Sequence, residues 1–165
     1  MRYRVIFGFW MALVATGACS QTPVEVAEWV EEKSPSAPTY STDLLIPVEM
    51  PPYVTLKVGI DPATLTVGAT DGLVRYVVVM RNATGSVNVA FEGIRCTTGE
   101  VKTYARVNAA GKWVNSEQAP WKDMTSNLPS RHAYAIAKQG ACEGRTAGKV
   151  DDIVRALRRR QLAPD

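Results

Sequence analysis

The sequence predicts an α+β fold, namely an antiparallel β meander with one or two C-terminal helices packed on the sheet. Two observations support this class. From Leu44 to Val107, short runs of β-branched and aromatic residues alternate with turn residues. Beyond them, apolar residues recur at the spacing of a helix that packs on a core. With 46% hydrophobic and 21% charged residues, the chain has the composition of a globular domain.

Turn signals set the boundaries of the expected strands. Asp71-Gly72 opens the clearest strand, and both faces of that strand are apolar, as in the centre of a covered sheet. Asp61-Pro62-Ala63-Thr64 is expected to turn the chain. The expected strands are Tyr53–Val58, Leu65–Val67, Leu73–Arg81, Val87–Cys96 and Val101–Val107, followed by a turn toward Trp113 and Val114.

The apolar residues of the strand Val87–Cys96 change phase along its length. Those up to Phe91 occupy odd positions, whereas Ile94 and Cys96 occupy even ones. Because a shift of one residue exchanges the two faces of a strand, this pattern predicts a β-bulge or bend at Gly93.

Two helices are expected in the C-terminal third. The first is Ala133–Gln139, with Gly140 as its stop signal. The second has acidic residues near its start and arginines toward its end, which suits the helix dipole. Its apolar stripe consists of Val150, Ile153, Val154 and Leu157.

Residues 1–18 have the pattern of a signal peptide. A start with Arg2 and Arg4 precedes the apolar stretch Val5–Val14, which is shorter than the roughly 20 residues that span a bilayer. Loss of this segment would remove two of the 19 basic residues and leave the chain close to balance with its 16 acidic ones. We therefore expect no nucleic-acid partner, because such binding needs a basic surplus.

The run Ala15-Thr16-Gly17-Ala18-Cys19 resembles the bacterial lipobox. The resemblance implies that the chain is cut before Cys19, that this thiol is acylated, and that the protein is a periplasmic lipoprotein whose membrane partner is reached through the lipid. Two or three acyl chains anchor a protein stably, whereas one does not. Ser20 after the cysteine favours the outer membrane. An ordinary signal peptide cut near Ala18 is the alternative.

Residues 19–43 are expected to form the lipid anchor and a tether rich in Pro, Ser and Thr. Thr22-Pro23-Val24-Glu25 matches a capping box at the start of a short acidic helix that ends near Lys33. Ser34–Thr42 is expected to be an extended, solvated spacer, with docking to a partner as the alternative. Residues 44–165 then form a single α+β domain.

The chain has three cysteines, an odd number for an exported protein. With Cys19 assigned to lipid, Cys96 and Cys142 remain and can form one disulfide in an oxidising periplasm. Two buried free thiols or a redox pair are the alternatives, although no Cys-x-x-Cys spacing is present.

Several segments between Gly72 and Trp121 form a recognisable set. They are Val74–Val79, Phe91–Glu100 with its Glu-Gly-Ile-Arg-Cys string, Tyr104-Ala105, Trp113 and Trp121, preceded by Asp61–Gly68. This set resembles the cryptic neisserial protein-like family of uncharacterised proteobacterial envelope proteins. The resemblance implies an envelope domain of that type and brings no activity, substrate or catalytic residue.

The sequence contains no familiar catalytic or metal-binding motif. His132 is the only histidine, so no usual zinc ligand set can be assembled. The chain also lacks a serine-hydrolase elbow and a phosphate-binding loop. We therefore expect no cofactor and no enzymatic activity, and we expect His132 to cap or flank a helix.

Glu92 and Arg95 flank the expected bulge, and bulges often redirect side chains near functional sites. Together with Trp113 and Trp121 they are the candidate binding residues. The tryptophans have burial in the core as their alternative. The alternative for Glu92 is a structural ion pair, with Arg75, Arg81 or Arg95 as its partner.

Two functional hypotheses follow. In the first, a non-enzymatic envelope lipoprotein binds a protein, peptidoglycan or another envelope component. In the second, a small enzyme or small-ligand binder is built around Glu92, Arg95 and the nearby tryptophans, which requires these side chains to converge in one pocket. We favour the first hypothesis.

Overall fold

A sheet with helices on one face forms the body of the domain. The computed structural model describes residues 28–33, 35–116, 118–126 and 131–160. Its antiparallel sheet of seven strands has the order β1-β2-β3-β4-β5-β6, and β7 also pairs with β5. The strands are β1 (Ile46–Val48), β2 (Lys57–Val67), β3 (Val74–Arg81), β4 (Val87–Arg95), β5 (Glu100–Val107), β6 (Trp113–Asn115) and β7 (Lys122–Asp123).

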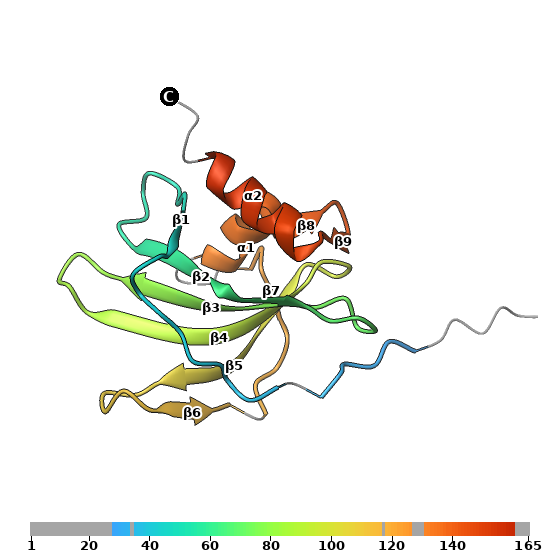
Figure 1. The fold of residues 1–165 in the computed structure, drawn as a ribbon, viewed down its shortest axis with the longest axis horizontal. Coiled ribbons are helices and arrows are strands. Elements are labelled where there is room, and N and C mark those ends of the chain that lie inside the picture. The colour runs from blue at the N-terminus through green and yellow to red at the C-terminus, as the bar shows by residue number, and fades with distance from the viewer. Residues whose placement is uncertain (1–27, 34, 117, 127–130, 161–165) are drawn as a thin grey trace, which may run out of the picture.

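The C-terminal third packs its helices against this sheet, which confirms the predicted α+β class (Figure 1). α1 (His132–Ile136) continues into a π-helical turn, η1 (Ala137–Ala141), in which Gly140 leaves the helical conformation with φ 137°. A small hairpin, β8 (Cys142–Glu143) and β9 (Thr146–Ala147), leads into α2 (Val150–Arg160). The predicted stripe of α2 faces the core, since Ile153 and Leu157 are fully buried.

The predicted turn at Asp61–Thr64 is instead an irregularity inside the long strand β2. The pairing of β2 with β3 shifts between Asp61 and Thr66. The Asp61 carboxylate accepts a hydrogen bond from Ala63 N–H, and the Thr64 hydroxyl both donates to Asp61 O and accepts from Val77 N–H. Because these bonds satisfy the local backbone, the strand continues past Pro62, which cannot donate to the ladder.

The predicted bulge at Gly93 is wrong in its position. β4 pairs with β3 without a shift from Val87 to Ile94, so its phase change reflects a strand buried on both faces. The irregularity lies in the neighbouring strand: Glu92 pairs with Thr103 and Phe91 with Ala105, which leaves Tyr104 as the extra residue of β5. A Cβ added at Gly93 would lie 2.8 Å from the Tyr104 ring, so glycine is needed there.

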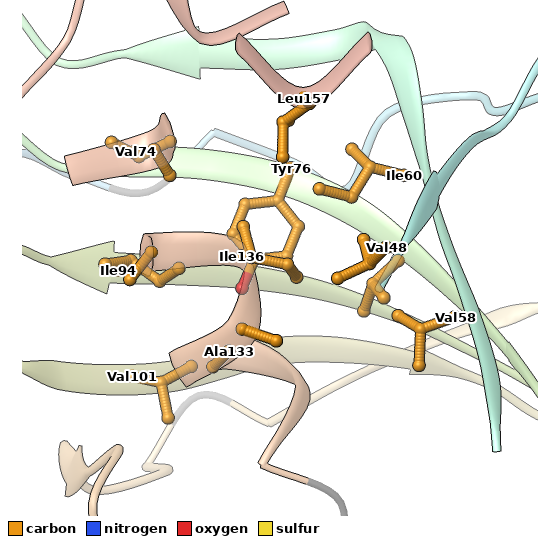
Figure 2. Close-up of a cluster of buried hydrophobic side chains, with 14 of the residues drawn as sticks. Val48, Val58, Ile60, Val74, Tyr76, Ile94, Val101, Ala133, Ile136 and Leu157 are labelled. Carbon is orange, nitrogen blue, oxygen red and sulfur yellow. The ribbon is translucent and has the colours of Figure 1, made fainter. Parts of the chain in front are cut away.

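The main core lies between the sheet and the helices. Tyr76 of β3 is fully buried at its centre, close to Ile136 of α1 and Leu157 of α2 (Figure 2). Ile60 and Ile94 extend this core along the sheet. Aromatic and branched side chains of this size contribute most of the apolar area that folding removes from water.

The opposite face of the sheet is covered by the N-terminal strap, residues 29–33 and 35–41. Phe91 and Val77 are buried there beneath the partly buried Ala37 and Tyr40. In Figure 1 the strap, drawn in blue and cyan, crosses the strands before it enters β1. A face with apolar residues on β3 and β4 needs a cover, and in the described part of the chain the strap provides it.

The structure therefore differs from a solvated spacer in this region. Ser41 N–H donates to the Asp61 carboxylate at 2.8 Å, and the Trp113 ring N–H donates to Pro38 O at 3.1 Å. Residues 28–33 are not helical. The predicted helix start at Thr22 lies outside the described residues, as do the signal-like segment and Cys19.

The predicted disulfide between Cys96 and Cys142 is confirmed. The two Cα atoms are 5.6 Å apart, and the bond joins the end of β4 to the first residue of β8 over a sequence separation of 46. It ties the helical layer to the sheet at the same end as η1.

Removing this disulfide should lower the free energy of unfolding by about 3–4 kcal/mol, because the unfolded chain regains the freedom of a long loop. The change is the double substitution Cys96→Ser with Cys142→Ser, which leaves neither partner of the bond as a free thiol. Urea denaturation of the variant and of the oxidised wild type measures the difference. Equal midpoints would contradict a stabilising role.

Candidate functional site

Glu92 is a buried carboxylate on the helix-facing side of β4. Its side chain is 2% exposed, and its cross-strand neighbours are Tyr76 on β3 and Thr103 on β5. His132, the first residue of α1, reaches down to it, and Nε2 of His132 lies 2.7 Å from Oε2 of Glu92. The Thr103 hydroxyl donates to the other carboxylate oxygen at 3.2 Å. Glu92 is therefore held by a histidine that lies 40 residues away in the sequence.

Tyr76 borders the same carboxylate from the core side. Its hydroxyl is fully buried and makes no hydrogen bond of ordinary geometry within the described residues. Burial, together with the nearby Glu92 carboxylate, raises the pKa of Tyr76 well above its ordinary value. The phenol is therefore protonated over the physiological pH range and is a donor held beside Glu92.

A pocket of about 570 Å³ opens beside Glu92 and His132. This volume falls within the range of small-molecule sites, roughly 300–1,000 Å³. The pocket lies between β5, β7 and the loop that joins β6 to β7. Its apolar lining consists of Leu56, Met80, Val101, Ala119 and Pro120, and its polar lining of Asn88, Glu92, Thr103, Arg106, Ser116, Lys122 and His132.

The four predicted binding residues do not converge in this pocket. Glu92 lines it, whereas Arg95 and Trp121 lie on the strap side of the sheet. Glu92 and Arg95 differ by three positions on a regular strand. Because side chains alternate between the two faces, these two point to opposite faces. The predicted pairing of Glu92 with an arginine is therefore wrong, and His132 is its partner.

Arg95 and Trp121 instead hold Trp29 of the strap. The Arg95 guanidinium carbon lies 3.7 Å from the centroid of a Trp29 ring, and Trp29 meets Trp121 edge to face at 6.2 Å. The Trp29 ring N–H donates to Asp71 O at 3.0 Å. Trp113 lies apart from them, edge to face with Tyr40 at 5.6 Å.

The carboxylate of Glu31 binds the strap to the sheet through three side-chain hydrogen bonds. It accepts hydrogen bonds from Lys102 Nζ at 3.0 Å, the Tyr104 hydroxyl at 2.8 Å and the Trp121 ring N–H at 3.2 Å. Burial alone would raise the pKa of Glu31, but the bonds from Lys102 and Tyr104 outweigh it, and the net pKa is lowered. The ionised strap is thus matched to a cationic and aromatic surface.

Next to Glu31, Glu32 joins the strap to a buried ion pair. Its backbone N–H donates to the Asp71 carboxylate at 3.0 Å, and Asp71 in turn pairs with Arg75 at 2.5 Å. A Cβ at Gly68 would lie 1.9 Å from this carboxylate, so the Asp71 geometry requires glycine there. Breaking such a buried pair at one partner costs several kcal/mol.

Sequence reasoning placed His132 at a helix end, as observed, but missed its bond to Glu92 and the role of Trp29. The opposite orientations of Glu92 and Arg95 follow from strand alternation alone. By contrast, the pairing of Glu92 with His132 depends on how α1 packs on the sheet. In the described ranges, no helix is long and apolar enough to span a membrane, and no cluster of three potential metal ligands occurs.

Replacing Glu31 should destabilise the fold more at neutral pH than in acid. Because the folded pKa of Glu31 is lowered, its ionised contacts stabilise the fold above the unfolded pKa, and this contribution is lost as pH falls through the folded pKa. We expect Glu31→Gln to cost about 1 kcal/mol at pH 7 and clearly less at about pH 3, below the ordinary pKa of glutamate. Urea denaturation at both pH values measures this, and Glu28→Gln, at an exposed glutamate, is the control. Equal losses at the two pH values would contradict it.

The comparisons with known proteins agree with the resemblance noted in the sequence. Cryptic neisserial protein 1 of Neisseria gonorrhoeae is 28% identical over 106 residues, which cover 56% of this chain and 51% of the relative. The chain thus spans about half the length of this curated relative, and no solved structure matches it. A family model described as the CNP1-like family matches residues 24–158. Because this match covers most of the 165 residues, the chain belongs to the CNP1-like family.

Proposed function

We propose that the protein is an exported lipoprotein, anchored through Cys19 to the periplasmic side of a membrane. Ser20, the residue after this cysteine, favours the outer membrane. Its domain acts as a non-enzymatic binding module. The signal-like residues 1–18 and the lipobox-like run that ends at Cys19 support the anchor. The Cys96–Cys142 disulfide supports export, because such bonds persist in oxidising compartments.

In this proposal the anchor holds the domain close to the membrane. Trp29 lies ten residues after Cys19, and a fully extended chain of that length spans at most about 35 Å. Within the described residues, the strap contacts the sheet from Trp29 onward. While the strap is bound, the later proline-rich residues therefore do not lengthen the connection between the anchor and the domain.

The observation that carries the binding role is the buried Glu92–His132 pair in the wall of the 570 Å³ pocket. Replacing a buried ionisable pair by apolar side chains is often neutral or stabilising, so such a pair is weak evidence of a stabilising role. Convergent polar groups in the wall of an apolar pocket are, by contrast, typical of ligand sites. We therefore place the binding site there.

Within this proposal the ligand is a small molecule or a small exposed group of an envelope component, and peptidoglycan is one such source. A protein partner is compatible with the same site if it inserts a terminus or a single side chain. A broad flat interface does not fit, because the polar groups sit in a recess rather than on a plane.

The anchor is tested by Cys19→Ser. Without the thiol no acyl chain can be attached, so we expect the protein to move from the membrane to a soluble or unprocessed fraction. Fractionation of cells with detection of the chain measures this. The disulfide is the internal control, since it should persist in the variant. Retention of the lipid-modified mass in the variant would contradict the proposal.

The pocket is tested by thermal unfolding of the full chain with the small-molecule fraction of an envelope extract. A ligand at a hundred times its Kd stabilises by about 2.7 kcal/mol, so the wild-type midpoint should rise. The rise should be lost in His132→Gln, whose side chain lines the pocket. Glu143→Gln, at an exposed glutamate on β8, is the control and should keep it. An equal rise in all three proteins, or none in the wild type, would contradict this site.

A further inference from the structure

We infer that the ligand of the Glu92–His132 pocket is an anionic amphiphile, a molecule with a carboxylate or phosphate headgroup on an apolar body. The inference rests on the proposed function and specifies the ligand of the same site. Three features carry it: the charges around the pocket, the bulge in β5, and the apolar wall.

The accessible charge around the pocket is positive. Glu92 is the only carboxylate among the described lining residues, and it is 2% exposed and bound to His132 and Thr103. Arg106 and Lys122 line the same pocket and are exposed, and neither is paired with a carboxylate within the described part of the chain. Among the described lining residues, a ligand therefore meets two cations without a carboxylate partner and no free anion.

The bulge in β5 places Arg106 on the pocket side. In a regular strand, Thr103 and Arg106 would point to opposite faces, because their positions differ by three and side chains alternate. The extra residue at Tyr104 restores them to one face: Thr103 pairs with Glu92 and Arg106 with Ala90, and both of these belong to the helix-facing side of β4. Arg106 Nη2 lies 3.4 Å from the Thr103 hydroxyl, which confirms that they are neighbours.

Lys122 reaches the same face from the other neighbour of β5. Its cross-strand partner is Val101, a buried residue of the main core that also lines the pocket. Lys122 of β7 and the β5 residues Thr103 and Arg106 therefore all lie on the pocket side of the sheet. Arginine presents a planar fork that matches carboxylate and phosphate oxygens, and lysine adds a compact positive charge.

The remaining wall favours an apolar body. Leu56, Met80 and Val101 line the pocket from the sheet side, and Ala119 and Pro120 line it from the loop before β7. An ion without an apolar part would leave this surface in water, whereas an alkyl or aromatic body would remove it from water. A cationic amphiphile fits the wall equally well but meets the wrong charge at Arg106 and Lys122.

The test uses four probes with six carbon atoms each: hexanoate, hexyl phosphate, hexanol and hexylamine. Each is titrated by calorimetry into the full chain in the same neutral detergent. We expect hexanoate and hexyl phosphate to bind at least about tenfold more tightly than hexanol and hexylamine, the gain typical of a charge-assisted hydrogen bond. The stronger of the two anions identifies the headgroup.

Matched charge substitutions locate the effect. Arg106→Gln should reduce the affinity for the anionic probes about tenfold and leave hexanol unchanged. Arg158→Gln removes the same charge from an exposed position of α2, outside the pocket, and should change neither. Both arginines are exposed, so the variants are expected to fold.

The outcomes separate this inference from the proposed function. If hexanol or hexylamine binds as tightly as the anions, the pocket is a ligand site but the anionic preference is refuted. If no probe binds, or if Arg158→Gln acts like Arg106→Gln, the inference is likewise refuted. The binding role itself then stands or falls on the envelope-extract experiment, which assumes no ligand class.

Discussion

The extra residue at Tyr104 in β5 is the constraint on which both faces of the domain depend. Before it, Lys102 points to the strap side and Thr103 to the helix side. After it the alternation is shifted by one, so Tyr104 and Ala105 both lie on the strap side. The inserted residue thus leaves Tyr104 beside Glu31 and brings Arg106 to the pocket on the other face. A regular strand would place Tyr104 and Arg106 on the same face.

The bulge is tolerated because its neighbour on β4 is glycine. The Tyr104 ring lies over Gly93, where any Cβ would approach it to 2.8 Å. Cross-strand neighbours of this glycine, Arg75 and Lys102, lie on the same face and contribute to the surface that receives the strap. The Glu-Gly-Ile-Arg string therefore combines three structural tasks: a buried carboxylate, space for an aromatic ring, and a guanidinium that stacks on Trp29.

Much of the fold could be predicted from periodicity, and the exceptions have identifiable causes. β3, β4, β5 and α2 were found close to their true bounds because their apolar patterns are long. The bulge was placed one strand too early, since apolar residues on both faces of β4 imitate a change of phase. The disulfide is predictable from the cysteine count, because assigning Cys19 to lipid leaves two cysteines that can form one bond. The strap is not evident from the sequence: its first part is typical of a short acidic helix and its proline-rich part of a linker. Its partners, among them Asp71, Tyr104 and Trp121, lie far away in the chain.

The candidate site was only half predictable for a related reason. The sequence singles out Glu92 as a candidate binding residue, but its burial and its partner are determined by tertiary packing. His132 follows the undescribed residues 127–130 and is oriented by Arg131, whose φ of 51° turns the chain into α1. Such a contact leaves no trace in local sequence.

The two faces of the sheet also differ in how their charged side chains are paired. On the strap side, Lys102 forms an ion pair with Glu31 of the same chain, and the Tyr104 hydroxyl donates to that glutamate. The pocket side keeps Arg106 and Lys122 unpaired with any described carboxylate, although Glu92 is only a strand's width away. Glu92 is bound to His132 and Thr103 instead, so its buried carboxylate is not free to face a ligand.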